Sequence, residues 1–145
     1  MSAVHVELVE GPIDLSQLIR RVRTDACGAV ASFLGVVREQ HEGRAVKGLS
    51  YEAYPSMALA EMRKIAGEAE ARFGPCTVAI VHRTGDLAIG EASVAVAVGA
   101  PHRGPAFDAC EYAIDELKRR VEIWKKEHYA DGEAAWVNNR SGVAR

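Results

Sequence analysis

The sequence predicts an α+β fold in which helices pack on a largely antiparallel sheet. Short segments with the alternating or continuous apolar residues typical of strands lie between three longer segments whose apolar residues have helical spacing. Gly and Pro punctuate the chain along its length and mark no linker. With 145 residues, of which 48% are hydrophobic, the chain is long enough to build one core. We therefore expect a single domain over residues 1–145.

The first third of the chain predicts a strand, a helix and a second strand. Residues 4–8 alternate between apolar and polar side chains, as in a strand. Asp14 is a suitable N-cap for the helical spacing of 15–22. The β-branched and aromatic run 28–37 is typical of a buried strand, and the polar residues 38–44 after it are expected to form a loop.

A strand and a long helix are expected next. Residues 46–54 alternate, and we expect them to pair antiparallel with 28–37. Pro55 suits the first turn of a helix, and Gly74 with Pro75 ends it.

Two strands and a third helix complete the prediction. The strands cover 76–82 and 92–98, and turn-rich residues at 84–86 separate them. The third helix begins near Pro105, and its apolar stripe continues in steps of three and four as far as Trp124.

Charge and composition exclude several classes of protein. Lys and Arg total 18 against 20 Asp and Glu, so the net charge is −2. This balance argues against DNA wrapping or anchoring to an acidic membrane surface, and any anion site must be local. The most apolar stretch, 92–101, is about half the ~20 residues that a membrane span needs, and no basic-then-apolar leader opens the chain. We expect a cytoplasmic protein.

The residues that usually carry metal, disulfide or nucleotide chemistry are scattered. Cys27, Cys76 and Cys110 form no C-x-x-C pair, so we expect reduced core thiols and neither a disulfide framework nor a zinc site. The five histidines lack H-x-x-x-H spacing, and neither a P-loop nor a dinucleotide fingerprint occurs. We therefore expect no metal site and no cofactor.

Positive charge concentrates at the end of the expected third helix. Between residues 117 and 126, five cations stand against one anion, Glu122. Lys118 and Lys125 are seven residues apart, which on a helix leaves them within ~20° of one direction and therefore on one face. The cluster is either a solvated helix end whose cations complement the helix dipole or a site for an anion.

Two further positions suit an anion. His102 and Arg103 stand where a strand ends and a helix begins, so backbone N–H groups and two cationic side chains could converge on a phosphate. Arg38 follows the apolar run 28–37, at the end of a strand. A surface turn and a solvated strand terminus explain the same residues.

Six motifs, taken in order, resemble one family. The motifs are FLGVVR at 33–38, YEAY at 51–54 with Met57, HRTGDL at 82–87 with Gly90 and Glu91, APHR at 100–103 with Ala106, Phe107 and Cys110, IDELK at 114–118, and IWKKE at 123–127. In this order and spacing, the chain resembles the catalytic large subunit of molybdopterin synthase over roughly residues 4–137.

The resemblance implies an α/β-hammerhead fold and a homodimer with a small ubiquitin-like subunit at each end, a heterotetramer. It implies a reaction in which two sulfurs enter cyclic pyranopterin monophosphate and form the dithiolene of molybdopterin. The implied sulfur donor is the thiocarboxylated C-terminal glycine of the small subunit, whose Gly-Gly tail enters the active site. No catalytic cysteine is then needed on this chain.

The resemblance also assigns residues to the site. Lys118 and Lys125 match the two active-site lysines; Lys118 is our first choice for the proton-transferring or nucleophilic role, and Lys125 for orienting the thiocarboxylate. A lysine that is partly desolvated beside another cation has a lowered pKa, which suits such chemistry. The implied pterin and phosphate pocket is lined by Arg38, His102 and Arg103, with Val36, Val37, Lys126 and Glu127 beside them and Arg140 contributed by the neighbouring protomer.

The chain departs from the family pattern at Glu122, where many relatives carry proline. A helix continuous through Glu122 would shift Lys125 relative to Lys118.

Two other functions stay open from the residues alone. One is a non-enzymatic dimeric module that binds a partner's extended tail and an anionic ligand, and the other is a transferase for phosphorylated ligands unrelated to pterins.

Overall fold

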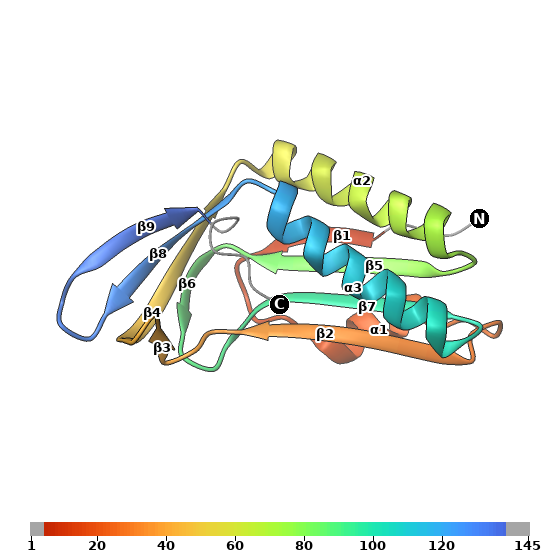
Figure 1. The fold of residues 1–145 in the computed structure, drawn as a ribbon, viewed down its shortest axis with the longest axis horizontal. Coiled ribbons are helices and arrows are strands. Elements are labelled where there is room, and N and C mark those ends of the chain that lie inside the picture. The colour runs from red at the N-terminus through yellow and green to blue at the C-terminus, as the bar shows by residue number, and fades with distance from the viewer. Residues whose placement is uncertain (1–4, 139–145) are drawn as a thin grey trace.

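A four-stranded sheet forms the centre of the molecule (Figure 1). In the computed structural model, which describes residues 5–138, its strands lie in the order β1 (His5–Val9), β5 (Thr77–Arg83), β7 (Ala92–Ala100) and β2 (Ala29–Val36). β1 and β5 are parallel, and the other neighbouring pairs are antiparallel. The expected mixture of helices with a largely antiparallel sheet is confirmed.

Three helices cover the two faces of this sheet (Figure 1). α1 (Leu15–Val22) packs against the central strands β5 and β7 on one face. On the other face, α2 (Pro55–Phe73) and α3 (Arg103–Arg120) lie side by side. The carboxylate of Asp14 accepts a hydrogen bond from the backbone N–H of Gln17 at 3.1 Å, so the predicted N-cap is confirmed.

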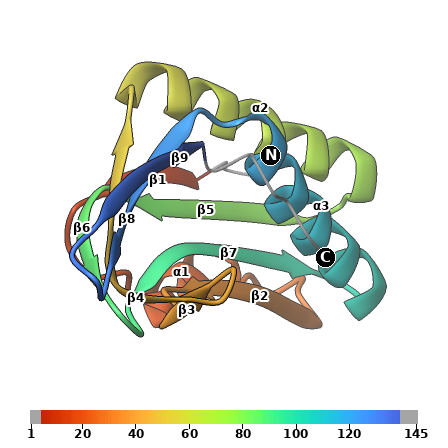
Figure 2. The same cartoon turned by 60° about the vertical axis from the view of Figure 1, so that its left-hand side comes forward.

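A second, antiparallel sheet stands at one end of the first (Figures 1 and 2). Its strands lie in the order β3 (Gln40–His41), β4 (Arg44–Ala53), β8 (Ile123–Tyr129) and β9 (Ala134–Asn138). β6 (Gly85–Ala88) pairs with β4 as well. Buried residues of β4 and β8 belong to the same apolar cluster as α2, α3 and the first sheet, so the two sheets share one core.

The strand predicted at 28–37 forms, but its expected burial is wrong. β2 is the edge strand of the first sheet, with β7 as its neighbour on one side. Phe33 and Val36 are therefore 38% and 50% exposed. The predicted pairing of 46–54 with this strand is also wrong, because β4 pairs with β3, β6 and β8 in the second sheet.

The third helix is shorter than predicted. It ends at Arg120, and the backbone N–H of Val121 closes it with a 3.1 Å hydrogen bond to the carbonyl of Leu117. Lys125 lies on β8 and not on the helix. The prediction that Lys118 and Lys125 share one helix face is therefore wrong. Glu122 lies between the helix and the strand, so the expected effect of a helix running through it does not arise.

The sequence prediction also missed three strands. The turn expected at 84–86 opens into β6, the polar loop at 38–44 contains β3, and β9 had no predicted counterpart. Among residues 5–138, no helix has the length and apolarity needed to cross a membrane.

Candidate active site

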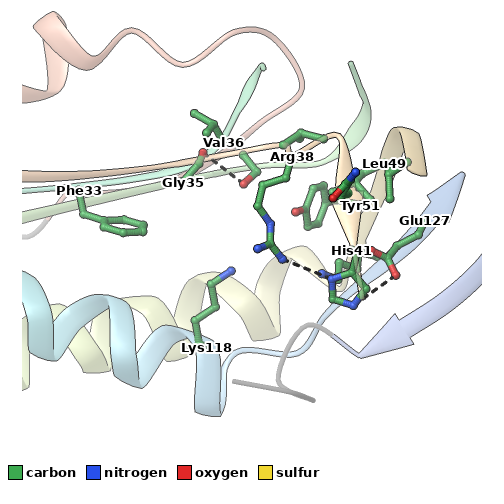
Figure 3. Close-up of a pocket in the computed structure, with 14 residues that line it drawn as sticks. Phe33, Gly35, Val36, Arg38, His41, Leu49, Tyr51, Lys118 and Glu127 are labelled. Atoms are coloured by element: carbon green, nitrogen blue, oxygen red, sulfur yellow. Dashed lines mark hydrogen bonds and ion pairs between the residues drawn. The ribbon is translucent and has the colours of Figure 1, made fainter. Parts of the chain in front are cut away.

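A cavity of about 170 Å³ opens where the end of β2, the β3–β4 hairpin, β8 and the last turn of α3 meet (Figure 3). Six of the residues predicted for the site line it, and residues that the prediction did not include complete it. The predicted residues are Val36, Val37, Arg38, Lys118, Lys125 and Glu127; the others are Phe33, Gly35, Gln40, His41, Val46, Leu49, Tyr51 and Ser93.

Lys118 and Lys125 reach the cavity from different elements. Lys118 projects from the last turn of α3, and Figure 3 shows its ammonium directed toward the side of the cavity where Arg38 lies. Side chains alternate along β8, so Lys125 shares a face with Ile123 and Glu127, both of which are buried. The two lysines therefore converge through the fold of the chain and not through helical periodicity.

This convergence changes the acidity of Lys118. Burial, and after it the positive charge of Lys125, lowers the pKa of Lys118 to about 8. Both causes disfavour the ammonium form, since burial removes its water and a second cation repels it. Near neutral pH, Lys118 can therefore either donate or accept a proton.

The end of β2 positions Arg38. Val37 is buried and held by its backbone: its N–H donates to the carbonyl of Glu91 at 2.9 Å, and its carbonyl accepts from the N–H of Gly90 at 2.8 Å. Gly35 allows β2 to approach β7 closely, because a Cβ there would lie 2.7 Å from Cγ1 of Val94. The exposed guanidinium of Arg38 is thus carried on a fixed segment at the mouth of the cavity.

One buried carboxylate faces these cations. Glu127 is 2% exposed, and its Oε1 accepts a hydrogen bond from the Tyr129 hydroxyl at 2.9 Å. Nε2 of His41 lies 3.8 Å from the same oxygen, and Nδ1 of His41 lies 3.4 Å from Nη2 of Arg38. The described residues that line the cavity therefore combine three cationic side chains with one carboxylate, an arrangement that favours an anionic ligand.

Two buried rings lie at the cavity wall: Tyr51 lines the cavity, and His82 packs against Tyr51. His82 packs edge to face against Tyr51, with ring centroids 5.1 Å apart, and its Nδ1–H donates to the carbonyl of Arg83 at 2.7 Å. Burial lowers the pKa of His82 to about 4, so the ring is neutral at physiological pH. Burial likewise raises the pKa of Tyr51. Neither ring adds charge to the cavity at neutral pH.

The other predicted site residues lie elsewhere. His102 and Arg103 are exposed at the N-terminal end of α3. Lys118 follows Arg103 by 15 residues, which is about 22 Å along a helix axis, so one chain does not bring them together. Lys126 points away from the face of β8 that carries Lys125, and its Nζ lies 5.6 Å from the centroid of the Trp136 ring. The remaining predicted residue, Arg140, lies outside the described residues.

The local excess of positive charge is smaller than the sequence suggests. Arg119 pairs with Glu116 at 3.1 Å. Arg120 pairs with Glu68 at 2.6 Å and also with Glu116 and Glu61. Arg119 thus pairs within α3, and Arg120 joins α3 to α2. Lys118 and Lys125 are the cations of the predicted cluster that line the cavity.

The prediction of core thiols is confirmed for Cys110 and wrong for Cys27, which is only partly buried. Cys76 and Cys110 are buried, and burial raises the pKa of each to about 11. Both are therefore protonated at neutral pH and weak nucleophiles. Within residues 5–138, no group of three or more potential metal ligands is present.

Comparisons with known proteins identify the family. The model of the MoaE protein family matches residues 8–120. The molybdopterin synthase catalytic subunit of Oryza sativa subsp. indica is 46% identical over 135 residues, which is 93% of this chain and 69% of the relative. The crystal structure of molybdopterin synthase from Staphylococcus aureus superposes with a TM-score of 0.87 at 39% identity, covering 91% of this chain and 96% of that one.

A more distant structure shares the fold. It is a complex of subunits 1 and 2 of molybdopterin-converting factor from Helicobacter pylori, with a TM-score of 0.73 at 21% identity, covering 94% of this chain and 91% of that one. The resemblance drawn from the six sequence motifs is thus confirmed. The chain belongs to the MoaE family, the catalytic subunits of molybdopterin synthase.

Proposed function

We propose that this chain transfers sulfur from the thiocarboxylated C-terminus of a small ubiquitin-like subunit to cyclic pyranopterin monophosphate, which forms the dithiolene of molybdopterin. One observation carries the proposal: Lys118, Lys125 and Arg38 meet at a single cavity in a chain of this family. Both proposed reactants are anions: the pterin precursor carries a phosphate, and the tail of the small subunit ends in a thiocarboxylate. A cavity with three cations suits both.

Each cation has a distinct proposed role. Lys118, with a pKa of about 8, transfers protons or attacks as a free amine during sulfur transfer. Lys125 orients the thiocarboxylate and stabilises the negative charge that develops during attack, as oxyanion-hole donors do. Arg38 binds the phosphate, because a guanidinium offers paired N–H donors that match phosphate oxygens.

The proposed sulfur donor is a partner subunit. The described residues that line the cavity include no cysteine, and the pKa of the buried Cys110 is raised to about 11, so this thiol is a poor donor. A partner tail that ends in Gly-Gly would fit a narrow cavity because glycine has no side chain. The Helicobacter pylori complex of two subunits supports such a pairing. We place the reaction in the cytoplasm, where free thiols stay reduced.

A second copy of this chain completes the proposed assembly. An apolar groove between β2 and α3, lined in part by Phe33, Phe107 and Ile114, leaves Phe107 64% exposed. Contact between two copies would bury this surface.

Arg103 and Lys118 lie too far apart on one chain to serve the same cavity. Their predicted roles are compatible only if Arg103 of one copy and Lys118 of the other serve one cavity. Unfolding and refolding a mixture of Arg103→Ala and Lys118→Ala chains should then restore about a quarter of the activity, since half the dimers hold one complete cavity.

A reconstituted reaction tests the function. The full chain is mixed with a small subunit that carries a C-terminal thiocarboxylate and with the pterin precursor, and dithiolene product is measured. The wild type and a Lys64→Ala control, altered on the exposed side of α2, should form product. Lys118→Ala should form none and still bind the partner. Tail binding by the wild type without product would favour the non-enzymatic binding module, and product from Lys118→Ala would remove this lysine from the mechanism.

A further inference from the structure

His41 connects two groups of the cavity that have opposite charges. Its Nδ1 lies 3.4 Å from Nη2 of Arg38, and its Nε2 lies 3.8 Å from Oε1 of the buried Glu127 (Figure 3). Nε2 also lies 3.7 Å from the carboxylate of Glu42, which is largely exposed. The imidazole therefore stands between the guanidinium at the mouth of the cavity and the carboxylate in its wall.

The β3–β4 hairpin holds His41 in place. Glu42 and Gly43 have φ values of +50° and +80°, as in the tight two-residue turns that fix strand register. This turn sets His41 opposite Arg44. Arg44 is anchored in turn, because its guanidinium lies 3.5 Å from the centroid of the Tyr129 ring and pairs with Asp131 at 2.9 Å. His41 is thus carried on a hairpin attached to β8 and to the loop that follows it.

The chemistry of Arg38 and Glu127, which face the two ring nitrogens, sets the tautomer of His41. A guanidinium has only N–H donors, so the nitrogen that faces Arg38 must be an unprotonated acceptor. The proton of the neutral ring then sits on Nε2, which faces the carboxylate of Glu127. The opposite tautomer would direct an N–H at the N–H groups of Arg38 and a lone pair at a carboxylate oxygen.

We propose that His41 is a positioning residue for Arg38. Its Nδ1 accepts from the guanidinium and holds it over the cavity, while Nε2–H is oriented by Glu127. Because Arg38 is the proposed phosphate-binding group, His41 sets the affinity for the phosphorylated pterin; this step rests on the proposed function. His41 contacts neither reacting centre in this arrangement, so it acts on binding and not on the chemical step.

Three substitutions of His41 distinguish its contact with Arg38 from its contact with Glu127. In His41→Asn, the amide oxygen occupies the place of Nδ1, so the contact with Arg38 is kept. In His41→Gln, the amide reaches only the place of Nε2, and His41→Ala loses both contacts. We expect KM for the precursor to rise about tenfold in the Ala and Gln variants, as for the loss of one charged hydrogen bond. It should stay within about twofold of the wild type in His41→Asn and in the control Glu42→Gln, with kcat nearly constant throughout.

A double-mutant cycle tests whether His41 acts through Arg38. In a chain that already carries Arg38→Ala, adding His41→Ala should leave KM unchanged, because the group that His41 positions is gone. A further rise of tenfold would show that His41 acts independently and would overturn the proposal. An equal loss in His41→Asn and His41→Ala would overturn it as well.

The tautomer supplies a readout that does not depend on activity. Two-dimensional ¹⁵N–¹H NMR of the full chain without substrate distinguishes the two ring nitrogens of a neutral histidine. We expect His41 with its proton on Nε2, and Arg38→Ala should weaken that preference. A proton on Nδ1 would overturn the proposal. If the wild type forms no product while His41 shows the expected tautomer, the proposed function has failed and the positioning of Arg38 stands.

Discussion

Replacing Lys118 by methionine should stabilise the fold at pH 7. Burial, reinforced by the charge of Lys125, lowers the pKa of Lys118 from its ordinary value of 10.5 to about 8. A tenfold change in the acid dissociation constant corresponds to about 1.4 kcal/mol, so the ammonium form destabilises the folded chain by about 3 kcal/mol. Methionine has a similar length and no charge, so the variant should regain most of this free energy of unfolding.

The sign of the effect depends on pH. Below about pH 8, Lys118 is protonated in both the folded and the unfolded chain, and the fold carries the whole destabilisation. Between about pH 8 and pH 10.5, the unfolded chain still binds the proton and the folded chain has released it. Raising the pH through this window therefore stabilises the wild type. At higher pH both states are neutral, and the advantage of methionine disappears.

Urea unfolding, followed by far-ultraviolet circular dichroism at pH 7 and pH 11, measures this difference. The gap in free energy of unfolding between Lys118→Met and the wild type should shrink by about 3 kcal/mol from the lower to the higher pH. Lys64→Met, on the exposed side of α2, should differ from the wild type equally at both pH values. A pH-independent gap for Lys118→Met would refute the claim that the fold disfavours the Lys118 ammonium.

Four further predictions concern activity and precursor binding. The rate of product formation should change with an apparent pKa of about 8, rising through that pH if the free amine of Lys118 reacts and falling if its ammonium donates a proton. Lys125→Ala should move this inflection to higher pH, because it removes a repelling charge; an unmoved inflection would assign it to another group. Arg38→Ala should weaken precursor binding by about 1.5–3 kcal/mol in titration calorimetry, and an unchanged affinity would place the phosphate elsewhere. Lys125→Ala should lower the rate far more than Lys126→Ala in the same assay, since the two side chains lie on opposite faces of β8; equal losses would contradict that arrangement.

Local signals predicted the elements that depend on local interactions. Asp14 caps α1 through a hydrogen bond to a residue three positions on, and Pro55 begins α2 because its ring suits the first turn. Such contacts form within a few residues and leave a mark in the sequence. The first two helices were therefore predicted with nearly correct bounds.

The end of α3 was mispredicted because its sequence satisfies two periods. Leu117, Val121 and Trp124 continue the helical spacing, while Ile123, Glu127 and Tyr129 are buried with the alternation of a strand. Pairing of β8 with β4, whose partner residues lie 70 or more positions away in the sequence, decides between the two periods. A periodicity argument uses neighbours along the chain and does not detect such a partner.

At the site, too, local sequence signals predicted some features, and long-range strand pairing determined the others. Family motifs located Lys118 and Lys125 by position, yet the geometric reason given for their proximity, one shared helix face, was wrong. His41 carried no signal in the sequence, and Tyr51 stood in the YEAY motif without being predicted as a site residue. They join the cavity through the β3–β4 hairpin and the pairing of β4 with β8, which bring together side chains from distant segments.

The charges of the cavity couple ligand binding to the protonation of Lys118. Among the described residues that line the cavity, Lys118, Lys125 and Arg38 stand against one carboxylate, that of the buried Glu127, so positive charge exceeds negative charge there. Burial lowers the pKa of Lys118 and the charge of Lys125 lowers it further; a bound phosphate or thiocarboxylate would offset the repulsion from Lys125. Anion binding must then favour the ammonium form of Lys118, and protonation must favour anion binding by the same free energy. When a bound anion leaves the cavity, the same coupling lowers the pKa of Lys118 again, so one set of charges links ligand release to proton release.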